Sequence, residues 1–391
     1  MTPIQTLYFV DGFDLIDYNR AFLKYDLYHD GFNQGDVVTG NGGGRALNTN
    51  NSAFDPTGAQ WIRSLSSPST LGIHIDYNPA ALGTWNWYTV SIGSTVLFTI
   101  HQRGDGRLDF LGPLAGLIAT TVNPLPVATF SNLVILLTFG TSGSLQVFVN
   151  DSNALSVATE PVNFGSFFPD RAGYFWNAGF GPGMTLDNYF LYDGLANVGP
   201  CHVDSMLPTA DNPNTVWIPG VTSPRVVTPT CFPMDNDDAG LFPGGAPDGD
   251  FSYISPVPSG NQLFTMQASR CYGNVLGVAV NACGRPNTGF SPQQFNFVVQ
   301  LSAGLQVVGT GTLLNVGSIA SDPHLKDYQT LQALMPVSPA SGGTWVDSEI
   351  TNGAFGVGSI ELQQRVTAFN LEKITSLRAE PFNCGGASYS Y

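Results

Sequence analysis

The chain is poor in charged residues, and lysine is especially scarce. Charged residues make up 11% of its 391 residues, whereas soluble domains usually carry roughly 25%. Lysine occurs three times, as Lys24, Lys326 and Lys373, and the net charge is −15. A surface of this sign repels phosphate backbones, and no run of basic residues is present to bind them. We therefore expect no nucleic-acid partner and no attraction to anionic membranes.

The chain also lacks the apolar segments that carry proteins into or across membranes. No stretch approaches the roughly 18 apolar residues that a membrane span needs. The most apolar run, Leu133–Phe139, has the length of a buried strand. The segment Met1–Leu15 contains no Lys or Arg, so the charged region of a signal peptide is missing. These absences predict a protein without a membrane partner.

Residue patterns of the common hydrolases are missing as well. Glycoside hydrolysis needs two carboxylates across a cleft, but Glu160 is the single glutamate in the first half of the chain, so aspartates would have to substitute. No G-x-S-x-G motif marks a serine nucleophile. The histidines are scattered, at His29, His74, His101, His202 and His324. We therefore expect no enzymatic activity.

The cysteines show no metal-binding spacing. No CxxC pair occurs, so we expect no structural zinc site. Two interpretations stay open: reduced and partly buried thiols, or disulfides in a particle that leaves the cell. In the second case an odd number of cysteines permits a bond between subunits. The candidates are Cys201, Cys231, Cys271, Cys283 and Cys384.

Turn-forming and strand-forming residues are abundant. Glycine (45) and proline (27) separate short runs of Phe, Tyr, Val and Thr, which favour strands. This composition predicts an all-β fold. In the first half, the expected strands are Thr6–Val10, Gly72–Tyr77, Trp87–Ile92, Val96–His101, Arg107–Phe110, Leu133–Phe139, Leu145–Val149 and Asp187–Tyr192. In the second half, they are Phe264–Ala268, Val275–Asn281, Phe295–Leu301, Leu305–Val316 and Gly356–Phe369.

Local patterns add one hairpin and two short helices. The strands Leu133–Phe139 and Leu145–Val149 are separated by a glycine-rich turn, which predicts an antiparallel hairpin. Short helices are expected near Pro169–Gly173 and over Asp327–Met335. The rest of the chain reads as strands and loops.

The length exceeds what one hydrophobic core usually organises, so we expect two domains. Aromatic and apolar residues open and close the first half, at 7–14 and 186–194. A domain whose first and last strands pair is typical of two-sheet jelly rolls. We predict a jelly-roll domain over residues 1–196, a loop-rich linker with an acidic segment over 197–260, and a second β-sandwich over 261–391.

Three tryptophans are candidates for surface contacts. Trp85 and Trp87 alternate in a predicted strand, so their side chains point to the same face. Core packing is the simplest interpretation. A contact between subunits and a platform that stacks against sugars remain the alternatives, for which Trp176 is the third candidate.

An acidic stretch resembles a calcium loop without matching it. Residue Ala239 stands where the EF-hand has its fifth-position ligand, and Ala246 where it has a bidentate glutamate. Turns built from Asp and Asn explain such a stretch equally well. No cofactor is expected beyond this possible calcium site, for which the candidate ligands are Asp235, Asp237 and Asp238, with Asp11 and Asp187 as a second place.

Several short motifs occur in a fixed order along the chain. The first half opens with Asp11-Gly12-Phe13-Asp14 and closes with Leu186-Asp187-Asn188. The motifs of the second half are Leu207–Asp211, Trp217, Asp248–Tyr253, Phe295–Gly311, Thr344–Ile350 and Phe355–Val357. In this order they resemble virion structural proteins of tailed bacteriophages, whose first domain is a concanavalin A/laminin G-like jelly roll.

The resemblance implies a repeated, non-enzymatic subunit of a phage collar, tail or head decoration. Its partners would be other copies of itself and other virion proteins, and it would be assembled in the host cytoplasm into the virion. Few charges and many aromatic residues suit broad subunit contacts. The alternative is a carbohydrate-binding adhesin that recognises a host-surface glycan; a glycosidase is a third hypothesis.

Overall fold

The computed structural model has an all-β fold, as the composition predicts. It describes residues 4, 6–12, 27–29, 37–39, 45–48, 59–176, 184–212, 218–221, 252–255, 260–269, 271, 273–286, 292–314, 328–360 and 364–377. Within these residues no helix is long and apolar enough to cross a membrane.

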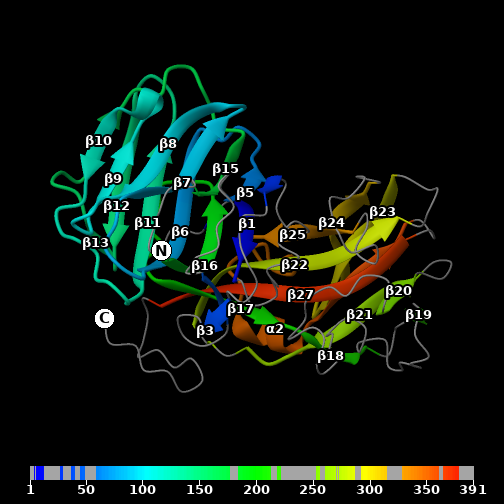
Figure 1. Ribbon diagram of the computed structural model, residues 1–391. Coiled ribbons are helices and arrows are strands. Elements are labelled where there is room, and N and C mark those ends of the chain that lie inside the picture. Colours follow the sequence, from blue (N-terminus) through cyan, green and yellow to red (C-terminus); the bar gives the residue numbers. More distant parts are fainter. Residues whose placement is uncertain are drawn as a thin grey trace. The chain divides into compact units, whose positions relative to one another are not determined.

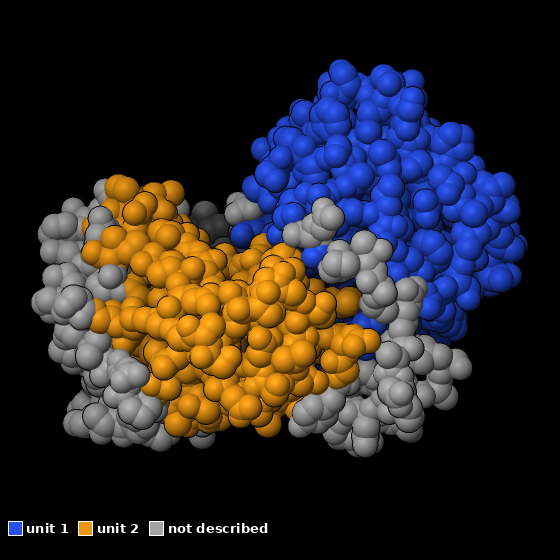
Figure 2. All heavy atoms as spheres, turned by 180° about the vertical axis from the view of Figure 1, so that it is seen from behind, with its two compact units in different colours: residues 1–13, 25–202, 376–391 blue, residues 14–24, 203–375 orange. Residues whose placement is uncertain are grey.

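The chain divides into two compact units (Figure 2). Unit 1 comprises residues 1–13, 25–202 and 376–391, and unit 2 comprises residues 14–24 and 203–375. The main boundary, between 202 and 203, lies close to the predicted end of the first domain at residue 196. Neither unit is one continuous stretch of sequence: residues 14–24 belong to unit 2, and residues 376–391 belong to unit 1. The prediction assumed domains that follow one another along the chain.

Unit 1 is a sandwich of two sheets (Figure 1). Its strands are β1 (Leu7–Asp11), β2 (Leu27–His29), β3 (Val37–Thr39), β4 (Arg45–Asn48), β5 (Ala59–Ser64), β6 (Thr70–Pro79), β7 (Trp85–Ile92), β8 (Thr95–Gln102), β9 (Leu108–Leu111), β10 (Leu117–Thr120), β11 (Ser131–Thr138), β12 (Gly143–Val149), β13 (Ser152–Asn153), β14 (Glu160–Val162), β15 (Arg171–Trp176) and β16 (Met184–Tyr192). The nine-stranded sheet has the order β13-β12-β11-β6-β16-β4-β3, with β1 added to β16 and β14 to β12. The seven-stranded sheet has the order β10-β9-β8-β7-β15-β5-β2.

Two predicted strand pairings are confirmed in unit 1. The opening strand β1 pairs antiparallel with the closing strand β16, from Leu7 opposite Tyr192 to Asp11 opposite Tyr189. Strands β11 and β12 form the predicted hairpin. The pairing of first and last strands closes the sandwich as in the predicted jelly roll.

Aromatic side chains fill the space between the two sheets of unit 1. Tyr77 of β6 and Trp87 of β7 stack with their ring centres 4.5 Å apart. The hydroxyls of Tyr88 and Tyr189 share a hydrogen bond of 2.8 Å, and Tyr174 packs against both rings. Each such ring buries on the order of 150–250 Å², so this cluster supplies a large share of the apolar burial that holds the sheets together.

Unit 2 is a second sandwich, made of a six-stranded and a five-stranded sheet. Its elements are β17 (Cys201–Met206), β18 (Pro208–Asp211), β19 (Ile218–Val221), β20 (Ser252–Ser255), β21 (Asn261–Met266), β22 (Asn274–Pro286), β23 (Gln293–Leu301), β24 (Gly304–Leu313), β25 (Gln329–Met335), α2 (Asp347–Asn352), β26 (Ala354–Ser359) and β27 (Gln364–Ser376). The six-stranded sheet runs β19-β20-β27-β22-β25, with β17 also paired to β27, and the five-stranded sheet runs β18-β21-β26-β23-β24. Apolar residues of both sheets, such as Phe264, Phe295 and Phe369, form one core.

Several local predictions are wrong. The expected helix near Pro169–Gly173 is the start of strand β15, and the expected helix over Asp327–Met335 is strand β25. Strand β25 pairs with β22 along seven positions, from Met335 opposite Val278 to Gln329 opposite Gly284. Its residues favour helices in isolation, but the apolar face of a sheet overrides that preference.

Other elements differ in extent from the prediction. The expected strand Gly356–Phe369 is divided into β26 and β27, which belong to different sheets. The stretch 197–260, expected to be loop-rich, contains β17, β18, β19 and β20. Most of the rest of this stretch, including residues 222–251, lies outside the described residues.

Candidate functional site

The two tryptophans of β7 lie in the core of unit 1. Trp87 is fully buried and Trp85 is 6% exposed. Among the described residues neither indole N–H has a hydrogen-bond partner. The interpretation as core residues therefore fits, and neither ring has a free face for a sugar or a subunit. The side chain of Trp176 lies outside the described residues.

The described cysteines are buried. Cys201 and Cys283 lie within strands β17 and β22 as buried side chains, and Cys271 is buried between β21 and β22. None of the three presents a surface sulfur to a neighbouring subunit. Cys231 and Cys384 lie outside the described residues, so a disulfide between subunits stays a prediction.

Only two of the five aspartates considered as calcium ligands lie in the described residues. Asp235, Asp237 and Asp238 lie outside the described residues. Asp11 and Asp187 are both buried, and Asp187 stands opposite Asp76 in the pairing of β16 with β6. Among the described residues no group of three His, Cys, Asp or Glu side chains is arranged to hold a metal ion.

A buried polar network lies on the face of the nine-stranded sheet that points away from the core between the two sheets. Strand β6 turns Tyr77 toward the core, so His74 and Asp76 point to the opposite face. The amide of Asn132 donates to Asp76 Oδ1 at 2.8 Å, and the amide of Asn188 donates to Asp76 Oδ2 at 2.7 Å. All four side chains are buried. The carboxylate of Asp76 thus ties three strands together.

The partners of His74 fix its protonation state. Its Nε2 faces two N–H donors, the Asn132 amide at 2.7 Å and the backbone N–H of Cys201 at 3.1 Å. Because both partners donate, Nε2 must accept, and the proton of the neutral ring sits on Nδ1. There it donates to the carbonyl oxygen of Asn188 at 2.7 Å. Burial accordingly lowers the pKa of His74 below its ordinary value of 6.5.

This network stabilises an irregular point in β16. Asn188 adopts a left-handed backbone conformation, with φ of 52°, and the pairing register of β16 with β6 shifts between Asp187 and Phe190. The ring of His74 stacks on Phe190 with centres 4.4 Å apart. Because the whole cluster is buried, it cannot reach a substrate, and we assign it a structural role.

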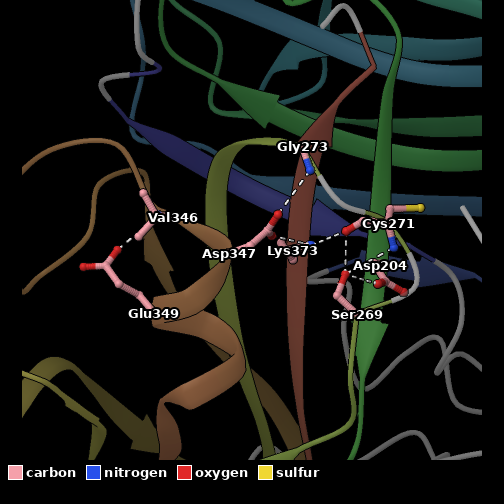
Figure 3. A network of polar contacts seen from close by, with 8 residues as sticks. All are labelled: Asp204, Ser269, Cys271, Gly273, Val346, Asp347, Glu349 and Lys373. Atoms are coloured by element: carbon pink, nitrogen blue, oxygen red, sulfur yellow. Dashed lines mark hydrogen bonds and ion pairs between the residues drawn. The ribbon is translucent and has the colours of Figure 1, made fainter. Parts of the chain in front are cut away.

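A second buried network lies in unit 2, around Lys373 of β27 (Figure 3). The Lys373 side chain is 0% exposed. Its ammonium donates to the carbonyl oxygen of Cys271 and to Asp347 Oδ1 at 2.9 Å. The backbone N–H of Gly273 donates to the other carboxylate oxygen, Asp347 Oδ2, at 3.2 Å. Figure 3 shows this carboxylate at the start of α2, turned toward β27.

The carbonyl of Cys271 also meets a second group of buried residues. Ser269 Oγ lies 2.8 Å from this oxygen and 2.6 Å from Asp204 Oδ2. The backbone N–H of Cys271 donates back to Ser269 Oγ at 3.3 Å. These bonds hold the segment between β21 and β22 in place beside Lys373. Sequence reasoning did not find this network, although a charged Glu372-Lys373 pair inside an apolar run was a signal for it.

The surface of unit 1 carries an apolar area at the edge of the seven-stranded sheet. The 3-10 turn η2 (Pro113–Ala115) connects β9 to the edge strand β10 and lies against β8. Leu114 in this turn is 100% exposed, Leu117 at the start of β10 is 62% exposed, and Val96 of β8 is 43% exposed. We refer to these three side chains as the loop surface. No charged residue occurs from Phe110 to Asn150.

The loop that carries Leu114 is held in a costly conformation. Leu114 and Ala115 have φ of 59° and 57°, a left-handed region that costs side-chain-bearing residues about 1–3 kcal/mol each. The backbone N–H of Gly112 donates to the carbonyl oxygen of Gly116 at 2.7 Å and closes the turn. The fold thus fixes an apolar side chain in full contact with water.

Comparisons with known proteins give only distant similarity. No family model matches the chain, and no curated protein matches it. Among solved structures, a Trypanosoma rangeli sialidase in complex with the inhibitor DANA aligns over 42% of this chain and 27% of its own, with 16% identity and a TM-score of 0.32. The receptor binding domain of botulinum neurotoxin C/D mosaic serotype aligns over 42% of this chain and 43% of its own, with 7% identity and a TM-score of 0.33. The chain thus spans less than half the length of these solved structures.

Proposed function

We propose that this protein is a non-enzymatic structural subunit that acts by packing against neighbouring copies of itself, in a tailed-phage particle as its ordered motifs imply. The observation that carries the proposal is the loop surface. A fully exposed leucine on a strained, closed turn is unfavourable in an isolated protein, because strain of this kind persists where it serves a function.

The chemistry of the loop surface fits a protein neighbour. Its side chains are apolar, and the surrounding segment from Phe110 to Asn150 has no charge, although the whole chain carries −15. Interface cores are depleted in Lys and Glu and are more apolar than the rest of a surface. Two copies that meet at Leu114 and Leu117 therefore bring together a stretch of chain without negative charge.

Self-association is tested by sedimentation at rising protein concentration. We expect the wild-type chain to associate and Leu114→Asp to weaken association roughly 10- to 100-fold, because burying one leucine is worth about 1.5–3 kcal/mol. Aspartate tolerates the left-handed backbone better than most residues, so the turn should survive. Mass spectrometry of purified particles should also detect the chain.

Leu82→Asp is the matched control. Leu82 is also more than half exposed, but it precedes β7, whereas Val96 follows the turn at the far end of that strand. This variant should associate like wild type. A wild-type chain that stays monomeric and is absent from particles would refute the proposal, as would equal effects of the two substitutions.

A further inference from the structure

The environment of Lys373 is unusual for a lysine. Lysines are almost never fully buried without a partner, and removing an ammonium from water costs several kcal/mol. Here the amine is held between two oxygen atoms, the carbonyl of Cys271 and Oδ1 of Asp347. No other lysine of the chain lies in the described residues.

The carboxyl group of Asp347 is held on its other side as well. Its Oδ2 accepts the backbone N–H of Gly273 at 3.2 Å. The helix that carries it is anchored by Glu349, which accepts the backbone N–H of Val346 at 3.1 Å and the hydroxyl of Ser338 at 2.9 Å. Both reacting groups are therefore fixed by bonds to atoms outside the pair, as Figure 3 shows for Asp347 and Lys373.

We propose that Lys373 and Asp347 condense to an amide, which forms an intramolecular cross-link between β27 and α2. The nitrogen Nζ attacks Cγ of Asp347 and forms the N–C bond, and the bond from Cγ to Oδ1 breaks. Nζ gives up two protons, both of which leave with Oδ1 as one water molecule. An ammonium and a carboxylate become a neutral amide, so the net charge of the chain is unchanged and no other reactant is needed.

The geometry meets the requirements of this step. A distance of 2.9 Å between Nζ and Oδ1 holds the amine beside the carboxyl group that it would attack, so the two reactants are already brought together by the fold. As the tetrahedral intermediate forms, negative charge develops on Oδ2, where the N–H of Gly273 already points. The Asp347 side chain is 28% exposed, so the water produced can leave.

Asp204 and Ser269 act as positioning residues in this proposal. Ser269 has one hydroxyl hydrogen but lies within bonding distance of two oxygens, at 2.6 Å from Asp204 and 2.8 Å from Cys271. A proton on Asp204 would satisfy both contacts, because Asp204 would then donate to the serine and the serine to the carbonyl. In either state these bonds hold the carbonyl that orients Nζ.

The intact mass of the full chain tests the proposal. The protein is purified, reduced, unfolded in denaturant and weighed by mass spectrometry. We expect a mass lower than that of the sequence by one water molecule. An ion pair leaves the mass unchanged, so recovery of the full sequence mass would overturn the proposal.

Peptide mapping locates the bond. Trypsin cuts after Arg365 and Arg378, but an amide at Lys373 blocks cleavage there. The expected product joins residues 327–365 to residues 366–378. It has the same mass as the linear peptide 327–378, but it carries two N-termini, so stepwise N-terminal sequencing should release Asp327 and Val366 together in the first cycle. Free cleavage after Lys373 would contradict the cross-link.

Variants separate the chemistry from the fold. Asp347→Asn is nearly isosteric, and its side chain would release ammonia instead of water, so its mass deficit should change accordingly. Lys373→Arg and Asp347→Ala cannot form the amide and should show full sequence mass. If either fails to fold, the wild-type mass and the Asp347→Asn mass still decide the question.

Discussion

The buried ring of His74 predicts that unit 1 is destabilised by mild acid. The two N–H groups that point at Nε2 are compatible with a neutral ring only. Protonation would place a third N–H against them and would put a charge in a buried site, a cost that the nearby carboxylate of Asp76 offsets only in part. The pKa of His74 in the folded chain is therefore below 6.5 because of burial, whereas the unfolded chain keeps the ordinary value.

The free energy of unfolding falls with decreasing pH because the unfolded chain binds the proton of His74 more readily than the folded chain. Between the folded pKa of His74 and 6.5, the unfolded state binds more protons than the folded state, so the free energy of unfolding rises with pH. This stabilisation is complete above pH 6.5. It is lost as pH falls below that value, by at most about 1.4 kcal/mol for each pH unit, until the folded pKa is reached.

Urea unfolding at pH 7.5, 6.5 and 5.5 measures this dependence, and the transition is followed by hydrogen exchange of peptides from unit 1, because the six tryptophans of the chain mix the fluorescence of both units. His74→Gln removes the titrating ring and serves as the comparison. Its stability at pH 7.5 should be lower by about 1–3 kcal/mol, because buried hydrogen-bond partners are left unpaired. Its pH slope between 7.5 and 5.5 should be shallower than that of wild type. Equal slopes would refute the assigned protonation state.

Two further substitutions test the packing of unit 1 by thermal or urea unfolding. Gly72→Ala should destabilise the fold by about 1–3 kcal/mol, because a Cβ there would lie 2.2 Å from the ring of Tyr192. Gly104→Ala is the control: the nearest atom to its Cβ would be 3.4 Å away, so stability should change little. Tyr88→Phe should lower the free energy of unfolding by about 1 kcal/mol, because it removes the 2.8 Å hydrogen bond to Tyr189. An unchanged free energy of unfolding would show that this bond contributes nothing.

The sequence predicts the outline of the fold well because strand signals are local. Alternation in β7 indicates that Trp85 and Trp87 share a face, and the structure places both in the core. The similarity of the opening and closing segments predicts the pairing of β1 with β16. The helix expected over Asp327–Met335 fails because its neighbour in the sheet, β22, lies far away in the sequence.

The polar networks could not be predicted for the same reason. Lys373 meets its partners 26 and 102 residues away along the chain, so no sequence window contains the contact. The loop surface is an intermediate case. The motif Gly112-Pro113-Leu114-Ala115-Gly116 indicates a turn, but the exposure of its leucine depends on the packing of β8 and β10 around it.

The pairing of β1 with β16 also sets the order of events during synthesis. Strand β1 leaves the ribosome well before its partner β16, which ends at Tyr192. At translation rates of roughly 5–20 residues per second, β1 must wait on the order of tens of seconds for that partner. During this time its apolar residues, including Phe9 and Val10, have no sheet to join. Completion of unit 1 is thus timed by translation, and the nascent strand is a natural client for a chaperone.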